Sequence, residues 1–151
     1  FNIHDMRDPL KGSYDAIFNL FTSFGYFNQE TTNIKVLKNF KNGLLPGGHI
    51  VVDFLNLEKA VQQLIPEQHI TKQGIDFVIR KRVSENFIIK EIEVNQNQEV
   101  HHYMEKVQAL DLDKMKYFAK EAGLEIQEIF GDYGLNAFDN DNSDRLILIL
   151  K

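Results

Sequence analysis

Two polar side chains stand where a ligand could reach them. Asp5 lies in a short loop before Pro9, and Asn19 interrupts the otherwise apolar stretch from Ala16 to Leu20. A buried amide needs a hydrogen-bond partner, and a carboxylate in an extended loop can accept a hydrogen bond from an amine. Asn19 is therefore predicted to contact a ligand, whereas Asp5 fits a ligand contact and a cap of its own loop equally well.

An aromatic segment follows Asn19 directly. Residues Phe21 to Phe27 combine phenylalanine and tyrosine rings with small polar residues and a glycine. If Ala16 to Leu20 is an inner strand of a parallel sheet, this segment lies beyond its carboxyl end, where α/β sheets bind ligands. We therefore expect residues 21–27 to form the floor of an active site.

Other common catalytic chemistries find little support in the sequence. Ser23 lacks the Gly-x-Ser-x-Gly setting of a nucleophile, and the absence of cysteine excludes thiolate chemistry. His101 and His102 are neighbours on a predicted strand, so their side chains point to opposite faces and cannot share an ion. No catalytic residue and no metal site are predicted.

Length and charge narrow the class of protein. The 151 residues suit one domain, and the net charge of -5 disfavours nucleic acid as a partner. The only basic cluster, Arg80-Lys81-Arg82, is interpreted as an exposed strand face rather than a binding patch. Without a long apolar run or a signal peptide, the chain is expected to be a cytoplasmic protein that does not contact membranes.

The elements that must position these residues begin as an α/β pattern. The strand Tyr14 to Leu20 is followed by a helix from Glu30 to Gly43 and by the strand His49 to Leu55, a unit that joins parallel strands. Pro46-Gly47-Gly48 is predicted to form the turn between helix and second strand, and Phe1 to His4 to end an earlier strand.

The middle of the chain changes period. After a short helix from Leu57 to Leu64, apolar and polar residues alternate, with polar breaks at 84–86 and 95–98. This pattern predicts an antiparallel meander over residues 67–109. The α/β pattern then resumes with a helix capped by Asp111 and ended by Gly123, and with strands at 124–130 and 146–150 around a polar loop.

These segments together resemble the class I S-adenosylmethionine-dependent methyltransferases. Asp5-Met6-Arg7, Tyr14 to Tyr26, and Leu44 to Phe54 with its Leu-x-Pro-Gly-Gly turn look like the family's third, fourth and fifth strand regions. The part after Asp111 resembles its last helix and its sixth and seventh strands. The meander is similar to the insertion of the small-molecule branch, which includes amino-sugar N,N-dimethyltransferases and glycine-type N-methyltransferases.

The resemblance implies a Rossmann-like sheet that lacks its first two strands, with residues 67–109 as an antiparallel insertion in one partial domain, 1–151. It also implies S-adenosylmethionine as the cofactor and a small molecule, an amine or a hydroxyl, as the methyl acceptor. The implied cofactor-binding residues are Asp5 and Met6 at the adenine, and Asn19, Leu20 and Phe21 at the methionine part.

The resemblance further implies which side chains wall the acceptor, namely Phe24, Tyr26 and Tyr133. Aromatic faces stabilise a nearby cation by roughly 0.5–2 kcal/mol, which suits a sulfonium or an amine that becomes charged. Methyl transfer depends on orientation and exclusion of water, so no general base is assigned.

The family's first two strands and its glycine-rich cofactor loop have no counterpart in this sequence. The chain is therefore expected to be part of a longer methyltransferase and, on its own, not to bind the cofactor. Tyr14 to Leu20 is expected to form an open edge that pairs with another chain, for example in a homodimer. The alternatives are an RNA or protein methyltransferase, or a non-catalytic α/β binding module if residues 1–151 are the whole gene product.

Overall fold

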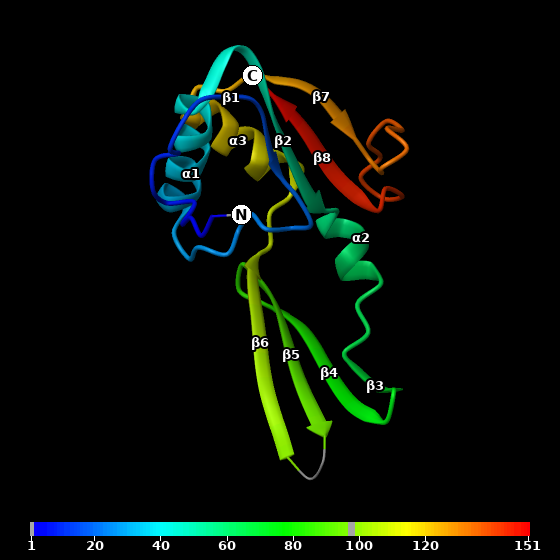
Figure 1. Cartoon of the computed structure of the whole chain (residues 1–151). Coiled ribbons are helices and arrows are strands. Elements are labelled where there is room, and N and C mark those ends of the chain that lie inside the picture. Colours follow the sequence, from blue (N-terminus) through cyan, green and yellow to red (C-terminus); the bar gives the residue numbers. More distant parts are fainter. Residues whose placement is uncertain (1, 97–98) are drawn as a thin grey trace.

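The computed structural model describes residues 2–96 and 99–151, which form two four-stranded sheets (Figure 1). The first sheet has the strand order β1-β2-β8-β7, and β1 and β2 run parallel whereas β8 is antiparallel to both β2 and β7. Its strands are β1 (Tyr14–Asn19), β2 (Leu44–Leu55), β7 (Ile126–Phe130) and β8 (Arg145–Leu150). The predicted α/β class and the parallel pairing of the first two strands are confirmed.

Two helices, α1 (Glu30–Asn42) and α3 (Leu112–Ala122), pack against each other beside the first sheet. α3 begins as predicted, because the Asp111 carboxylate accepts a hydrogen bond from the backbone N–H of Lys114 at 2.7 Å. It ends at Gly123, whose φ of 72° is the left-handed conformation that glycine adopts most easily. No helix in the described ranges is long and apolar enough to cross a membrane.

Side chains on alternate positions of β2 and β8 form the core on the helix side of this sheet. Six of them are almost completely buried: Ile50, Val52, Phe54, Leu146, Leu148 and Leu150. The opposite face carries a second apolar row, in which Phe18, Val51 and Ile149 are in register. This row is far more open, and Phe18 remains 63% exposed. One face of the sheet is thus packed and the other is accessible.

The Pro46-Gly47-Gly48 turn lies inside β2 rather than before it, which corrects the predicted strand boundary. Tyr14 pairs with Leu44, but two residues later Ala16 already pairs with His49, so residues 45–48 bulge out of the ladder. A Cβ on Gly48 would lie only 2.9 Å from the Asp15 carbonyl oxygen. Glycine is needed here because the neighbouring backbone passes so closely.

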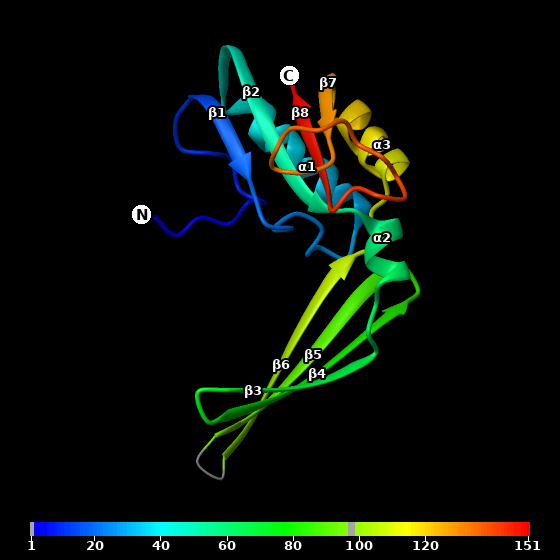
Figure 2. The ribbon, with the colours of Figure 1, turned by 90° about the vertical axis from the view of Figure 1, so that its right-hand side faces the viewer.

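The second sheet is the predicted meander, with the strand order β3-β4-β5-β6 and every neighbouring pair antiparallel. Its strands are β3 (Glu67–Lys72), β4 (Ile75–Ser84), β5 (Phe87–Gln96) and β6 (Glu99–Gln108). Of the polar break predicted at 95–98, Asn97 and Gln98 lie outside the described residues. Figure 2 shows this sheet extending away from the first, with α2 (Leu57–Gln62) at the junction.

A buried amide network fixes the end of the meander against the loop after β1. Asn33 on α1 donates a hydrogen bond to the side-chain oxygen of Gln108 at 2.7 Å. Gln108 in turn donates from its side chain to the Asn28 carbonyl oxygen at 3.2 Å and from its backbone to that of Gly25 at 2.8 Å. The two sheets therefore meet at the predicted ligand-binding loop.

The strand predicted at Phe1 to His4 is not formed where the structure describes it. Phe1 lies outside the described residues, and Asn2 to His4 are exposed and pair with no strand in the described ranges. The outer edge of β1 stays open in the described ranges, because residues 2–4 do not extend along it.

Phe24 lies in the core and does not wall a cavity, which corrects its assignment to the methyl acceptor. Its side chain is 0% exposed and its ring packs edge-on against that of Phe118, with 6.4 Å between the ring centroids. The loop after β1 therefore divides its aromatic rings between core and surface, since Phe21 is 76% exposed.

We predict that Phe24→Ala lowers the free energy of unfolding by about 3–5 kcal/mol, because it leaves a cavity beside Phe118. The matched control is Phe21→Ala, three residues away in the same loop, which removes an exposed ring and should change stability by less than about 0.5 kcal/mol. Denaturant titration measures both values. A loss for Phe24→Ala as small as the one expected for the control would show that Phe24 is not a core residue.

Candidate active site

A buried carboxylate stands at the carboxyl end of β2. The Asp53 side chain is 1% exposed. Its Oδ1 accepts a hydrogen bond from Arg145 Nε at 2.7 Å and forms an ion pair with Arg145 Nη2, also at 2.7 Å. Its Oδ2 accepts from the backbone N–H of Phe21 at 2.8 Å and from the Tyr133 hydroxyl at 3.0 Å. We call Asp53, Arg145, Tyr133, Phe21 and Thr22 the Asp53 cluster.

Strand register brings the two charges of the Asp53 cluster together. Asp53 pairs directly with Ile147, and Arg145 pairs directly with Leu55. Because side chains alternate along a strand, Asp53 and Leu55 share one face, and so Arg145 lies diagonally across from Asp53 on that face. The ion pair thus follows from the antiparallel alignment of β2 and β8.

The Asp53 cluster holds the loop after β1 in an unusual backbone conformation. Phe21 and Thr22 have φ values of 58° and 59°, a left-handed region that β-branched residues such as threonine seldom occupy. Two further hydrogen bonds secure Thr22, from its N–H to the Asp53 carbonyl oxygen at 3.0 Å and from Arg145 Nη2 to its hydroxyl at 3.2 Å. Such compensated strain is concentrated at functional sites.

Tyr133 acts as a hydrogen-bond donor in this cluster. Burial of its hydroxyl and the hydrogen bond to Asp53 raise the pKa of Tyr133 above its ordinary value. The Arg145 guanidinium lies 5.9 Å from the centroid of the tyrosine ring. The hydroxyl therefore stays protonated at neutral pH and donates its hydrogen bond to Asp53.

A cleft of about 430 Å³ opens between the first sheet, α2 and the meander. From the loop after β1 it is lined by Phe21, Thr22 and Tyr26, so part of the aromatic segment reaches a cavity. The other lining residues come from β2, α2, the meander and β8, and they are Leu55, Ala60, Gln63, Leu64, Lys81, Ile88, Lys90, Glu105, Val107 and Arg145. Its volume is typical of small-molecule sites.

A second hollow, of about 470 Å³, lies on the open face of the first sheet. It is almost entirely apolar and is lined by Phe18, Leu20, Phe21, Val51, Asp53, Tyr133, Leu135, Ile147 and Ile149. Phe21 thus borders both spaces. Tyr133 lies at this hollow rather than in the cleft, although both spaces meet at the Asp53 cluster.

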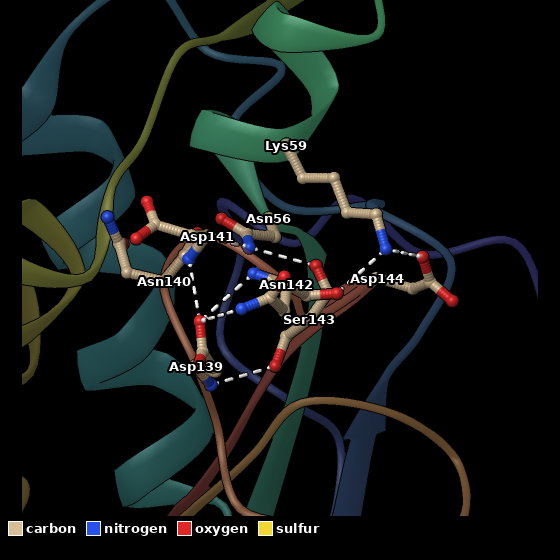
Figure 3. A network of polar contacts seen from close by, with 8 residues as sticks. All are labelled: Asn56, Lys59, Asp139, Asn140, Asp141, Asn142, Ser143 and Asp144. Carbon is tan, nitrogen blue, oxygen red and sulfur yellow. Dashed lines mark hydrogen bonds and ion pairs between the residues drawn. The ribbon is translucent and has the colours of Figure 1, made fainter.

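A polar network anchors the α2 wall of the cleft to the segment that leads into Arg145 (Figure 3). The buried side-chain amide of Asn56 donates to the carbonyl oxygens of Asn140 and Ser143, both at 2.8 Å. Lys59 Nζ donates to the Asn142 carbonyl oxygen at 2.7 Å and forms an ion pair with Asp144 at 2.6 Å. The helix and the loop are therefore held as one wall.

Asn19 and Met6, predicted at different parts of a cofactor, meet in the structure. Asn19 is 5% exposed, and its Nδ2 donates to the Met6 sulfur at 3.2 Å. The Met6 carbonyl oxygen accepts a hydrogen bond from the side chain of Asn39 at 3.1 Å. Within the described residues, Asn19 Oδ1 has no hydrogen-bond partner, so a buried acceptor is left unsatisfied there.

Asp5 caps its own loop, which is one of the two roles that the sequence allows it. It accepts hydrogen bonds from the backbone N–H of Arg7 at 2.9 Å and from Arg7 Nη2 at 2.6 Å. These hydrogen bonds, from the side chain first and then the backbone, lower the pKa of Asp5 to about 2. The carboxylate is ionised at neutral pH and remains accessible, with 41% of its side chain exposed.

Sequence reasoning misses the buried ion pair of the site, Asp53 and Arg145. It gives Asp53 no role beyond ending a strand, and it places Arg145 only at the start of the last strand region. The available signal is one acid inside the apolar run Ile50 to Leu55, together with one base before the apolar run Leu146 to Leu150. A lone charge on a buried strand demands a partner, although the sequence does not name that partner.

We predict that Asp53→Asn lowers the free energy of unfolding by about 3 kcal/mol, because Arg145 loses its ion pair and three donors compete for a weaker acceptor. Tyr133→Phe removes a single hydrogen bond and should lower it by about 1 kcal/mol. The control, Asp15→Asn on the exposed edge of β1, should leave stability within about 0.5 kcal/mol. Thermal and denaturant unfolding would refute the structural role of the cluster if Asp53→Asn were as mild as the control.

Comparisons with known proteins give no match to a protein-family profile and no match to a curated protein. Solved structures, by contrast, match across nearly the whole chain. An S-adenosylmethionine-dependent methyltransferase from Clostridium acetobutylicum superposes with a TM-score of 0.84 at 13% identity, covering 99% of this chain and 63% of that one. The CcbJ methyltransferase from Streptomyces caelestis gives 0.82 at 16% identity, covering 99% and 62%.

A third match is CalS10, an amino pentose methyltransferase from Micromonospora echinaspora solved with S-adenosylmethionine bound. It superposes with a TM-score of 0.67 at 16% identity, covering 97% of this chain and 62% of that chain. This chain therefore spans about three fifths of the length of the solved structures that it matches. Its fold is that of the S-adenosylmethionine-dependent methyltransferases, with a partial Rossmann-like sheet and an antiparallel meander.

Proposed function

We propose that this protein belongs to an enzyme that transfers a methyl group from S-adenosylmethionine to a small-molecule acceptor, an amine or a hydroxyl. The proposal is supported by a buried acceptor, Asn19 Oδ1, that has no partner among the described residues and lies at the carboxyl end of β1 in a methyltransferase fold. Carboxyl ends of parallel strands are where such sheets bind their ligands. The cleft that Phe21, Thr22 and Tyr26 line in the loop after β1 would supply the space for an acceptor.

The residues present fit the cofactor. Asn19 Oδ1 can accept a hydrogen bond from an ammonium or amine group, and it needs one because it is buried without a partner among the described residues. Met6 lies against Asn19, as expected if both border one ligand. Leu20 and Phe21 follow at the end of the strand, where an apolar surface would hold the aliphatic part of the cofactor.

Asp5 keeps its proposed contact with the adenine amine, in addition to its role as a loop cap. The carboxylate already accepts four hydrogen bonds from Arg7, which fill its roughly four lone-pair positions, so an adenine amine would replace one of these donors. Because the low pKa of Asp5 keeps it charged through the neutral range, it offers acceptors only. An exocyclic amine is a matching donor.

The chain's own residues orient the reacting groups. When bound, the cofactor would supply an electrophilic methyl group on a sulfonium. Phe21 and Tyr26 present aromatic surface to the cleft, which favours a cationic donor or a methylated amine by roughly 0.5–2 kcal/mol. The Asp53 cluster fixes the backbone of Phe21 through its N–H, so the point from which this ring projects is set before a ligand arrives.

The meander supports a small-molecule acceptor over a macromolecule. Lys81, Ile88, Lys90, Glu105 and Val107 close one side of the cleft, and α2 closes another. A bounded cavity of this size restricts the length of an acceptor more than an open groove would. Two of the matched structures are described as sugar or amino pentose methyltransferases, which favours the same class of acceptor.

We predict that Asn19→Ala weakens binding of S-adenosylmethionine to the full-length protein about tenfold, the effect of losing one hydrogen bond to a charged group. Asn33→Ala is the matched control, since Asn33 is also buried with an unpartnered Oδ1 among the described residues but contacts Gln108 instead. Isothermal titration calorimetry measures both affinities. An unchanged affinity for Asn19→Ala, or an equal loss for Asn33→Ala, would remove Asn19 from the cofactor site.

A further inference from the structure

Three charged side chains form a row across the meander wall of the cleft. Lys81 on β4 pairs directly with Lys90 on β5, and Lys90 pairs directly with Glu105 on β6. Directly opposed residues of antiparallel strands point to the same face, and all three line the cleft. Two positive charges therefore stand side by side, followed by one negative charge.

The basic run Arg80-Lys81-Arg82 is divided between the two faces of the meander. Arg80 forms ion pairs with Glu67 and Glu93, and Arg82 with Glu91, all involving exposed or half-exposed side chains. Lys81 points the opposite way, into the cleft. The prediction of an exposed strand face thus holds for the two arginines but not for the lysine between them.

Lys81 has no carboxylate within 4.0 Å in the part of the chain that the structure describes. Glu105, the nearest acid in the row, hydrogen-bonds to Lys90 at 3.2 Å. The remaining cation of the cleft, Arg145, is already paired with Asp53. The cleft therefore carries one positive charge more than its own carboxylates neutralise.

This arrangement lowers stability unless something compensates it. Like charges directly opposite each other on neighbouring strands repel, and here both lysines are half-buried beside the apolar pair Ile88 and Val107. Lysine loses hydration in such a place. A bound oxyanion would offset both effects, because it pairs with two ammonium groups at once.

We propose that Lys81 and Lys90 form a subsite for an anionic oxygen group, a carboxylate or a phosphate, on the molecule that enters the cleft. That this molecule is the methyl acceptor rests on the proposed function. The subsite would hold the acid group of the acceptor on the meander side and leave the amine or hydroxyl to face the loop after β1.

The probes are inorganic phosphate and acetate, titrated separately into isotopically labelled full-length protein and followed by amide chemical shifts. We expect shifts in β4 and β5 with phosphate, acetate or both, and the tighter of the two ions identifies the class of the group. Absence of shifts in these strands with either ion overturns the proposal without recourse to any variant.

Variants then assign the binding to the lysine pair. Lys81→Met and Lys90→Met should each weaken anion binding about tenfold or more, while Lys81→Arg retains it, since charge-assisted hydrogen bonds are the strong ones. Lys72→Met, on the exposed strand β3, is the control and should bind as the wild type does. Equal binding by Lys81→Met and wild type contradicts the subsite.

Two further measurements distinguish an anion subsite from a structural lysine and from a contact to the cofactor. Lys81→Met should unfold at the same temperature as the wild type or higher, because it removes a like-charge contact. A marked loss of stability would show a merely structural lysine.

Calorimetry with S-adenosylmethionine should give equal affinities for Lys81→Met and wild type. If the cofactor fails to bind wild type, the proposed function fails, whereas the anion titrations still decide the subsite.

Discussion

The ion pair between Asp53 and Arg145 is the contact on which the candidate site depends. It joins residues 92 positions apart in the chain, and the same carboxylate receives the backbone of Phe21 and the hydroxyl of Tyr133. Three separate segments thus converge on one buried anion. An unpaired charge at this depth is strongly unfavourable, so the fold keeps these segments together or loses much of its stability.

The cleft exists because two sheets with different roles meet at an angle around α2 (Figures 1 and 2). The first sheet supplies a rigid floor, since its helix-side core is almost fully buried. The meander contributes a wall. Its side chains alternate in direction along each strand, and this places Ile88, Lys90, Glu105 and Val107 on the inner side. A defined chemical surface thus arises from the period of two along each strand.

Local signals in the sequence are sufficient for most of the fold. The cap at Asp111, the glycine at 123 and the alternation over residues 67–109 act within a few residues, so helix α3 and the meander could be predicted. Phe24 could not be placed, because the direction of its ring depends on Phe118, far along the chain. The Asp53 and Arg145 pair requires the register of β2 and β8, which no single sequence reveals.

We propose that the methyl donor binds at the carboxyl end of β1. A crystal structure of the full-length protein with S-adenosylhomocysteine would show where the ligand lies. We predict that the thioether sulfur lies beside Phe21, with the amino group of the ligand bonded to Asn19 Oδ1 and the adenine against Met6. A ligand bound away from these residues, or a full-length protein that saturating ligand leaves empty, would contradict the account.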